Sequence, residues 1–144
     1  MKVEIFCLCD FAQADAGGKL TIIGIFDTIH TSVVPATHNF CSLAARIRFE
    51  NKEEGMKKIK ISIIDLDGKP IIPAMEVLVP VKIQSNLTHA NIQVVSLIPQ
   101  ITFPNFGEYL IGLEIDGQQA TSLPIYVRQS PIIPPHFQTR PQTA

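Results

Sequence analysis

The sequence predicts an all-β protein: an antiparallel β-sandwich of about seven or eight strands, immunoglobulin-like, with little or no helix. Apolar and polar residues alternate with a period of two along most of the chain, which is typical of half-buried strands. Short clusters of turn-forming residues separate these stretches, and none shows sustained helical periodicity with caps. A length of 144 residues fits one domain, which we place at residues 1–129.

Four strands are expected in the first half of the chain. Residues 3–11 carry apolar side chains on one face, and residues 20–29 are apolar on both faces. A strand of the second kind is expected to be central in a sheet or covered by another chain. The next two strands alternate regularly, and their expected inward residues are Leu43, Ala45, Ile47, Phe49, Ile59, Ile61 and Ile63. We expect these two strands to pair as a hairpin around the turn at residues 51–55.

The second half of the chain adds four more expected strands. They are residues 71–83, 92–103, 109–115 and 121–127. Pro73 and Pro80 interrupt the first of them, and Pro99 interrupts the second. Because proline cannot donate a hydrogen bond to a strand ladder, both strands should lie at edges or be bulged. Open edges favour a sandwich over a closed barrel, which is the alternative.

Turn residues support the same architecture. Asp67-Gly68 and Asp116-Gly117 predict two-residue hairpin turns, since both central positions want a positive φ that these residues tolerate. Tyr109 stands two residues after Gly107 at the start of a late strand. This resembles the tyrosine corner of immunoglobulin-like sandwiches, in which the hydroxyl bonds back to nearby backbone.

The glycine pair between the first two expected strands raises the question of a phosphate-binding loop. Such a loop needs a glycine, four residues and then Gly-Lys-Ser/Thr at the start of a helix. Here Lys19 is followed by Leu20, Gln13 stands where the first glycine would be, and a strand follows. The stretch therefore predicts a hairpin turn.

Composition limits the classes of partner. The chain is 46% hydrophobic but only 17% charged, which hints that part of its apolar surface is covered by another chain. A formal net charge of -1 gives no global field for nucleic acid or an anionic membrane, and we expect neither as a partner. Glu4 interrupts the early apolar run, so no secretory signal is expected. We therefore expect reduced thiols and a cytoplasmic location.

One cluster of charge is a candidate partner-binding site. If the strands on either side of residues 51–55 pair as a hairpin, then Arg46, Arg48, Lys58 and Lys60 form a basic patch on one sheet face. Like charges directly opposite one another are destabilising, so the patch would suit an acidic partner. The alternative is that a neighbouring strand supplies Glu76 or Glu114 as the counter-charge.

The chemistry-bearing residues predict no enzyme. Cys7 and Cys9 share one face of a strand and lack the paired spacing of a zinc site, so with Cys41 they are expected to be buried small hydrophobes. The four histidines have no metal-ligand spacing, and His38 is expected in a surface loop at residues 34–40. Aspartates near strand ends, namely Asp10, Asp27, Asp65 and Asp67, leave a calcium cluster on one rim open as an alternative to ordinary turn capping. No catalytic residue and no cofactor are expected.

The last fifteen residues differ from the rest. Prolines become frequent after Arg128 and the periodicity stops, so residues 130–144 are expected to form an extended or disordered tail. Within it, Pro131-Ile132-Ile133-Pro134 has the spacing of peptides that bind aromatic grooves.

Three blocks carry a resemblance to a known family. They are Cys9-Asp10-Phe11-Ala12 with the following GGKLTIIGIFD, the strand from Arg46 to Glu50, and Asp65-Leu66-Asp67-Gly68-Lys69. Together they resemble an uncharacterised family of small bacterial proteins, over about residues 2–128. The resemblance implies a bacterial source and a compact β-sandwich, but no activity and no functional residue.

Two functions remain open. The first is a non-enzymatic sandwich that binds a protein partner or assembles with itself, as a homo-oligomer, through apolar faces or open edges. The alternative is a module that binds a small ligand or a metal ion such as calcium through rim loops, for example residues 35–40 and 84–91.

Overall fold

The computed structural model describes residues 1–130 of the chain. Its strands are β1 (Lys2–Ala14), β2 (Leu20–Ile25), β3 (Thr28–Thr31), β4 (Ala36–Glu50), β5 (Gly55–Asp65), β6 (Met75–Val81), β7 (His89–Phe103), β8 (Gly107–Ile115) and β9 (Gln118–Gln129). A single 3-10 turn, η1 (Asn51–Glu53), is the one helical element of the described residues. The prediction of an all-β chain is confirmed.

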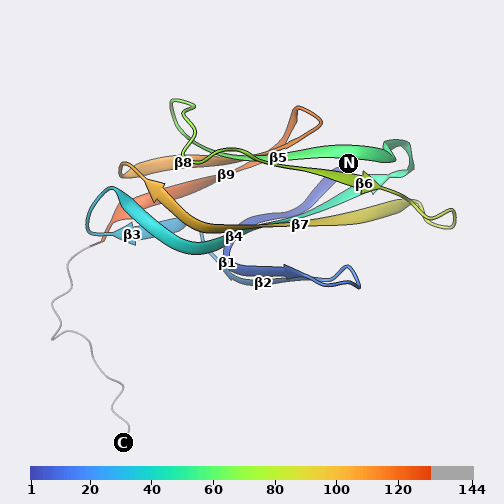
Figure 1. The fold of residues 1–144 in the computed structure, drawn as a ribbon, viewed down its shortest axis with the longest axis horizontal. Coiled ribbons are helices and arrows are strands. Elements are labelled where there is room, and N and C mark those ends of the chain that lie inside the picture. The colour runs from blue at the N-terminus through green and yellow to red at the C-terminus, as the bar shows by residue number, and fades with distance from the viewer. Residues whose placement is uncertain (131–144) are drawn as a thin grey trace, which may run out of the picture.

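Two sheets pack face to face, as expected for a sandwich (Figure 1). The four-stranded sheet has the order β2-β1-β4-β7, and the five-stranded sheet has the order β3-β9-β8-β5-β6. Neighbouring strands are antiparallel except for β3 and β9, which run parallel. The buried core between the sheets includes Leu43, Ile47, Phe49, Ile59, Ile61, Ile63, Ile111 and Leu113. The inward residues predicted from the alternation are all buried there.

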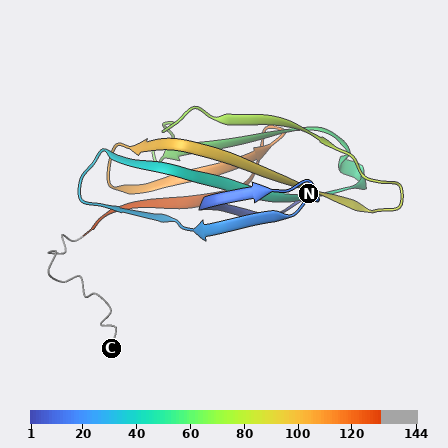
Figure 2. The ribbon, with the colours of Figure 1, turned by 60° about the horizontal axis from the view of Figure 1, so that its bottom comes forward.

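The β1–β2 hairpin forms a third layer. β1 leaves β4 after the pair Cys9–Ser42 and continues paired only with β2. Figure 1 shows the hairpin beneath β4 and β7, on the side away from the five-stranded sheet, and Figure 2 brings it to the front. Its tip comes close to β7, since a Cβ atom placed on Gly18 would lie 4.0 Å from Gln93 Oε1. The hairpin thus covers part of the outer face of the four-stranded sheet.

The prediction of one strand over residues 20–29 is wrong. The chain crosses from one sheet to the other after Ile25. As a result, β2 is an edge strand of the four-stranded sheet and β3 is an edge strand of the five-stranded sheet. Neither strand is central. Apolar residues occur on both faces because β2 packs Leu20 and Ile22 against the outer side of the four-stranded sheet and exposes its other face.

The predicted hairpin around residues 51–55 is also wrong. β4 pairs with β1 on one side and β7 on the other, so no edge of β4 is open to β5. The segment from η1 to Gly55 instead carries the chain into the other sheet, where β5 pairs with β6 and β8. The inward residues of β4 and β5 therefore meet across the core, from two different sheets, and do not lie side by side in one sheet. The apolar alternation of the sequence is the same in both arrangements, so it could not distinguish them.

Several local predictions are confirmed. The strands that contain Pro80 and Pro99, β6 and β7, lie at sheet edges. Asp116 and Gly117 have φ values of 51° and 80° and join β8 to β9, as a two-residue turn requires. The Tyr109 hydroxyl donates to the Asn105 carbonyl at 2.7 Å and accepts from the Asn105 N–H at 3.0 Å. This is the backbone anchoring predicted from the sequence around Gly107.

Two further predictions concern loops and the tail. Residues 36–40 belong to β4 rather than to a surface loop, and His38 is half-buried with its ring centroid 5.2 Å from that of Phe26. The turn before β2 is a hairpin turn, in which the Lys19 N–H donates to Asp15 Oδ1 at 2.9 Å. The predicted tail, apart from Ser130, lies outside the described residues.

Candidate functional site

The structure divides the four basic residues of the predicted patch between two sheets. Arg46 and Arg48 lie on β4, in the four-stranded sheet, whereas Lys58 and Lys60 lie on β5, in the five-stranded sheet. All four point outward, because the residues between them are buried in the core. Outward side chains of two packed sheets face opposite directions. A single basic patch therefore does not exist, and this prediction is wrong for the same reason as the hairpin.

Most of these charges have partners on neighbouring strands. Lys58 Nζ lies 3.3 Å from Glu76 Oε2, and Lys60 Nζ lies 3.9 Å from Glu114 Oε2. These are the two glutamates that the sequence offered as alternative counter-charges, so that alternative is confirmed for the lysines. Such exposed pairs stabilise a fold by about 0.2–1 kcal/mol each.

Arg46 is also neutralised, on the other sheet. Its Nε lies 3.4 Å from Glu4 Oε1. The Asn91 amide, with its nitrogen turned toward Glu4, donates to Glu4 Oε1 at 2.8 Å and accepts from an Arg46 terminal nitrogen at 2.8 Å. These three side chains, from β1, β4 and β7, close a polar network across the sheet. Glu4 Oε1 receives both contacts.

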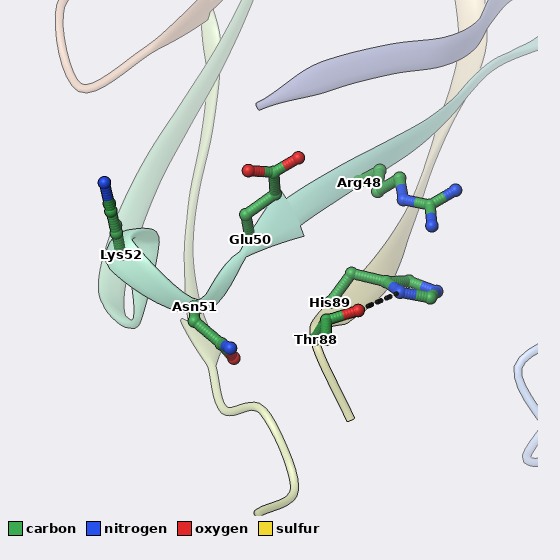
Figure 3. Close-up of a pocket in the computed structure, with 6 residues that line it drawn as sticks. All are labelled: Arg48, Glu50, Asn51, Lys52, Thr88 and His89. Carbon is green, nitrogen blue, oxygen red and sulfur yellow. Dashed lines mark hydrogen bonds between the residues drawn. The ribbon is translucent and has the colours of Figure 1, made fainter. Parts of the chain in front are cut away.

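Arg48 is different, because it borders a hollow. The hollow has a volume of about 380 Å³ and is lined by Arg48, Glu50, Asn51, Lys52, Thr88 and His89 (Figure 3). It lies where the end of β4 and η1 meet the start of β7. The Thr88 hydroxyl and His89 Nδ1 are 3.4 Å apart. Part of the predicted rim loop at residues 84–91 thus contributes to a concave polar site, which we call the Arg48 hollow.

The second surface feature is the outer side of the β1–β2 hairpin. Phe11 and Ile23 are cross-strand partners. Ile25 follows two residues after Ile23 on β2, where it pairs with Cys9. The side chains of Phe11, Ile23 and Ile25 are 48%, 57% and 67% exposed. We call these three residues the hairpin apolar face. The sequence signal for it was present in the two-faced apolar strand, but alternation could not show which face stays open.

The three cysteines are buried and free. Cys7 and Cys9 pack with Ala12 and Ala44 beneath the hairpin, against Leu20 and Ile22. Burial raises the pKa of Cys9 to about 11, with smaller contributions from neighbouring Cys7 and Asp10, and burial likewise raises the pKa of Cys41 to about 11. Thiols with such pKa values stay protonated and are poor nucleophiles and poor metal ligands. The expectation that they act as small buried hydrophobes is confirmed.

The aspartates of the predicted calcium rim lie on three segments: Asp10 is in β1, Asp27 stands between β2 and β3, and Asp65 and Asp67 share the turn at the end of β5. Asp65 Oδ1 accepts from the N–H groups of Asp67 and Lys69 at 2.9 and 2.8 Å, which is ordinary turn capping. Asp27 Oδ1 accepts from the Thr28 hydroxyl at 2.8 Å. Within residues 1–130, no three histidine, cysteine, aspartate or glutamate side chains gather in a group that could hold a metal ion. No helix in the same part of the chain is long and apolar enough to cross a membrane.

The architecture and these surfaces define the chain as a β-sandwich domain with an added hairpin layer. Residues 4–128 match the model of a family described as a family of unknown function (DUF6941). The chain belongs to this family, which confirms the expectation that it is a member of an uncharacterised family over most of its length. No curated protein matches the chain.

Solved structures offer distant likeness only. An alkylpurine DNA glycosylase, AlkC, from Pseudomonas fluorescens, bound to DNA with an abasic site analogue, aligns with a TM-score of 0.45 at 10% identity. That alignment covers 88% of this chain and 30% of the glycosylase. A glycosyl hydrolase family 2 member from Bacteroides cellulosilyticus aligns with a TM-score of 0.38 at 14% identity, over 60% of this chain and 12% of the hydrolase. This chain thus spans less than a third of either protein.

Proposed function

We propose that the domain is a non-enzymatic module that binds a protein surface through the hairpin apolar face, and that a second copy of the chain is its first partner. The observation that carries this proposal is the exposure of the cross-strand partners Phe11 and Ile23, and of Ile25 two residues further along β2. Contiguous apolar side chains of this kind mark interaction surfaces more often than isolated ones do.

The free edge of β2 supports the choice of a second copy. β2 is the terminal strand of its sheet and has β1 as its one strand partner among the described residues. An edge strand presents unpaired backbone groups that another strand can pair with. Antiparallel pairing of β2 with β2 of another copy is two-fold symmetric, so it would pair both free edges at once and bring the two hairpin apolar faces side by side.

Burial of thiols is consistent with a reducing, cytoplasmic compartment, which we propose as the location. All three cysteines are free although Cys7 and Cys9 are close neighbours on one strand. Free cysteines are usual where thiols are kept reduced.

Sedimentation velocity over a wide concentration range tests the proposal. The chain should form dimers, and Ile23→Asp should shift it to monomers, because a buried charge at the interface lacks a partner. Leu66→Asp is the matched control: Leu66 is 70% exposed in the turn after β5, and its replacement should leave the dimer intact. A wild-type chain that stays monomeric throughout would rule out self-assembly, and equal dissociation by both variants would rule out the hairpin apolar face.

A further inference from the structure

The Arg48 hollow lies on a different part of the molecule from the β2 edge and has a different chemistry. We propose that it binds a small ligand that carries an oxyanion, either a phosphate or a carboxylate group. The proposal rests on three observations: a guanidinium with no carboxylate partner, a neighbouring like charge, and a set of polar groups that line one concave site.

The strand register brings the central groups together. Arg48 pairs with Asn91 and Glu50 pairs with His89 between β4 and β7. Arg48 and His89 are therefore diagonal neighbours on the outward face of the sheet, a distance that long side chains can bridge. Figure 3 shows the Arg48 guanidinium and the His89 ring extending toward the same side of the site, with the Thr88 hydroxyl beside the ring.

Arg48 has a like charge beside it and forms no ion pair with Glu50, the carboxylate in the wall of the same hollow. Lys2 on β1 lies directly opposite Arg48, so two like charges face each other across the ladder. Among residues 1–130, Arg48 has no salt-bridge partner, in contrast to Arg46, Lys58 and Lys60.

Two further carboxylates near this end of β4 bind other groups. Glu4 binds Arg46 and Asn91. Glu53 binds the ammonium group of Met1 at 2.7 Å and the Glu50 N–H at 2.8 Å. An anion in the hollow would relieve the repulsion between Lys2 and Arg48.

The groups that line the hollow suit a compact anion. A guanidinium offers a planar fork that binds both oxygens of a phosphate or carboxylate. The Thr88 hydroxyl and the Asn51 amide add neutral donors, and a volume of about 380 Å³ is within the range of small-molecule sites.

Glu50 narrows the class of ligand. Its carboxylate belongs to the same wall, where it disfavours a long polyanion and can accept from a ligand hydroxyl. The lining includes the imidazole of His89 but no Phe, Tyr or Trp side chain to stack a base. The combination favours a small hydroxylated phosphate or carboxylate compound over a nucleic acid.

Titration of the full chain with inorganic phosphate, pyrophosphate and citrate, followed by amide NMR, tests the proposal. Saturable shifts are expected at Thr88, His89 and Asn51 with at least one of these probes, and none with sodium chloride at equal ionic strength. Phosphate and citrate as separate arms distinguish the two oxyanions. A wild-type chain that shows no saturable shift with any probe overturns the proposal, whatever the variants do.

Two variants of equal charge change make the test specific. Arg48→Gln should weaken binding at least about tenfold, because it removes the bidentate donor. Lys60→Gln, on the opposite sheet, should change it less than about twofold. Equal weakening by both variants would show a general charge effect and would overturn the proposed site. A single-stranded oligonucleotide that displaces the probes and binds more tightly than all of them would also overturn the proposal. If Arg48→Gln fails to fold, Arg48→Lys keeps the charge without the fork and should still weaken binding.

Discussion

Gly24 and Asp10 face each other where the β1–β2 hairpin leaves the four-stranded sheet. Cys9 is the last residue of β1 that pairs with β4, and the next pairs along β1 involve β2 alone. Gly24 has a φ of 70°, and a Cβ atom on it would collide with the Asp10 carboxylate. The absence of a side chain at Gly24 leaves room for the Asp10 side chain at this point of the hairpin.

Gly24→Ala should destabilise the fold by at least about 2 kcal/mol, since the left-handed conformation alone costs about 1–2 kcal/mol for a residue with a Cβ atom. Urea unfolding measures the loss. In an Asp10→Ala background the same change should cost less, because the colliding carboxylate is gone. Equal costs in both backgrounds would show that Asp10 does not contact position 24.

The assignment of the basic residues to two sheets makes a second prediction. A double-mutant cycle of Arg46→Gln with Lys60→Gln should show additive effects on unfolding free energy within about 0.3–0.5 kcal/mol. The cycle of Lys60→Gln with Glu114→Gln should instead show a favourable coupling of about 0.2–1 kcal/mol. A repulsive coupling between Arg46 and Lys60 would contradict their placement on two sheets and would support the hairpin predicted around residues 51–55.

The buried thiols make the fold sensitive to alkali. The pKa values of Cys9 and Cys41 rise from 9.0 to about 11 in the folded chain, because burial disfavours the thiolate. The folded chain therefore holds more protons than the unfolded chain between these values. Their contribution to stability is complete below pH 9.0 and is lost as the pH rises toward about 11.

Urea unfolding across this pH range checks the thiol prediction. The double variant Cys9→Ala, Cys41→Ala should lose less stability than the wild type between pH 9.0 and about 11. The variant also serves as the control for lysine and tyrosine titration, which is common to both chains. Parallel stability curves for the two chains would contradict the raised pKa values.

The local structure followed from the sequence because its causes are local. Alternation with a period of two predicted the inward residues of β4 and β5, all of which are buried. Pro80 and Pro99 predicted edge strands, because a missing N–H has the same consequence in any sheet. The Asp116-Gly117 turn and the Tyr109 anchor depend on residues a few positions apart, so short-range patterns were sufficient to find them.

The candidate sites were only partly predictable. Arg48 and the loop containing Thr88 and His89 were each named from the sequence, but as parts of different hypotheses. Their meeting depends on the pairing of β4 with β7, which are about forty residues apart along the chain. The sequence predicted that residues 20–29 are apolar on both faces, but it also predicted that the strand is central in a sheet or covered by another chain. Exposure of Ile23 and Ile25 depends on which side of the hairpin meets the sheet.

By itself, the sequence determined that the chain is built of strands, which side chains of β4 and β5 point inward, and where turns such as Asp116-Gly117 lie, since backbone geometry and side-chain polarity act over a few residues. Only the tertiary structure decided which strands become neighbours. β4 already has β1 and β7 at its two edges, so β5 must enter the other sheet and Arg48 is separated from Lys58. A strand has only two edges for hydrogen bonding, and the competition for them is settled by packing across the whole domain.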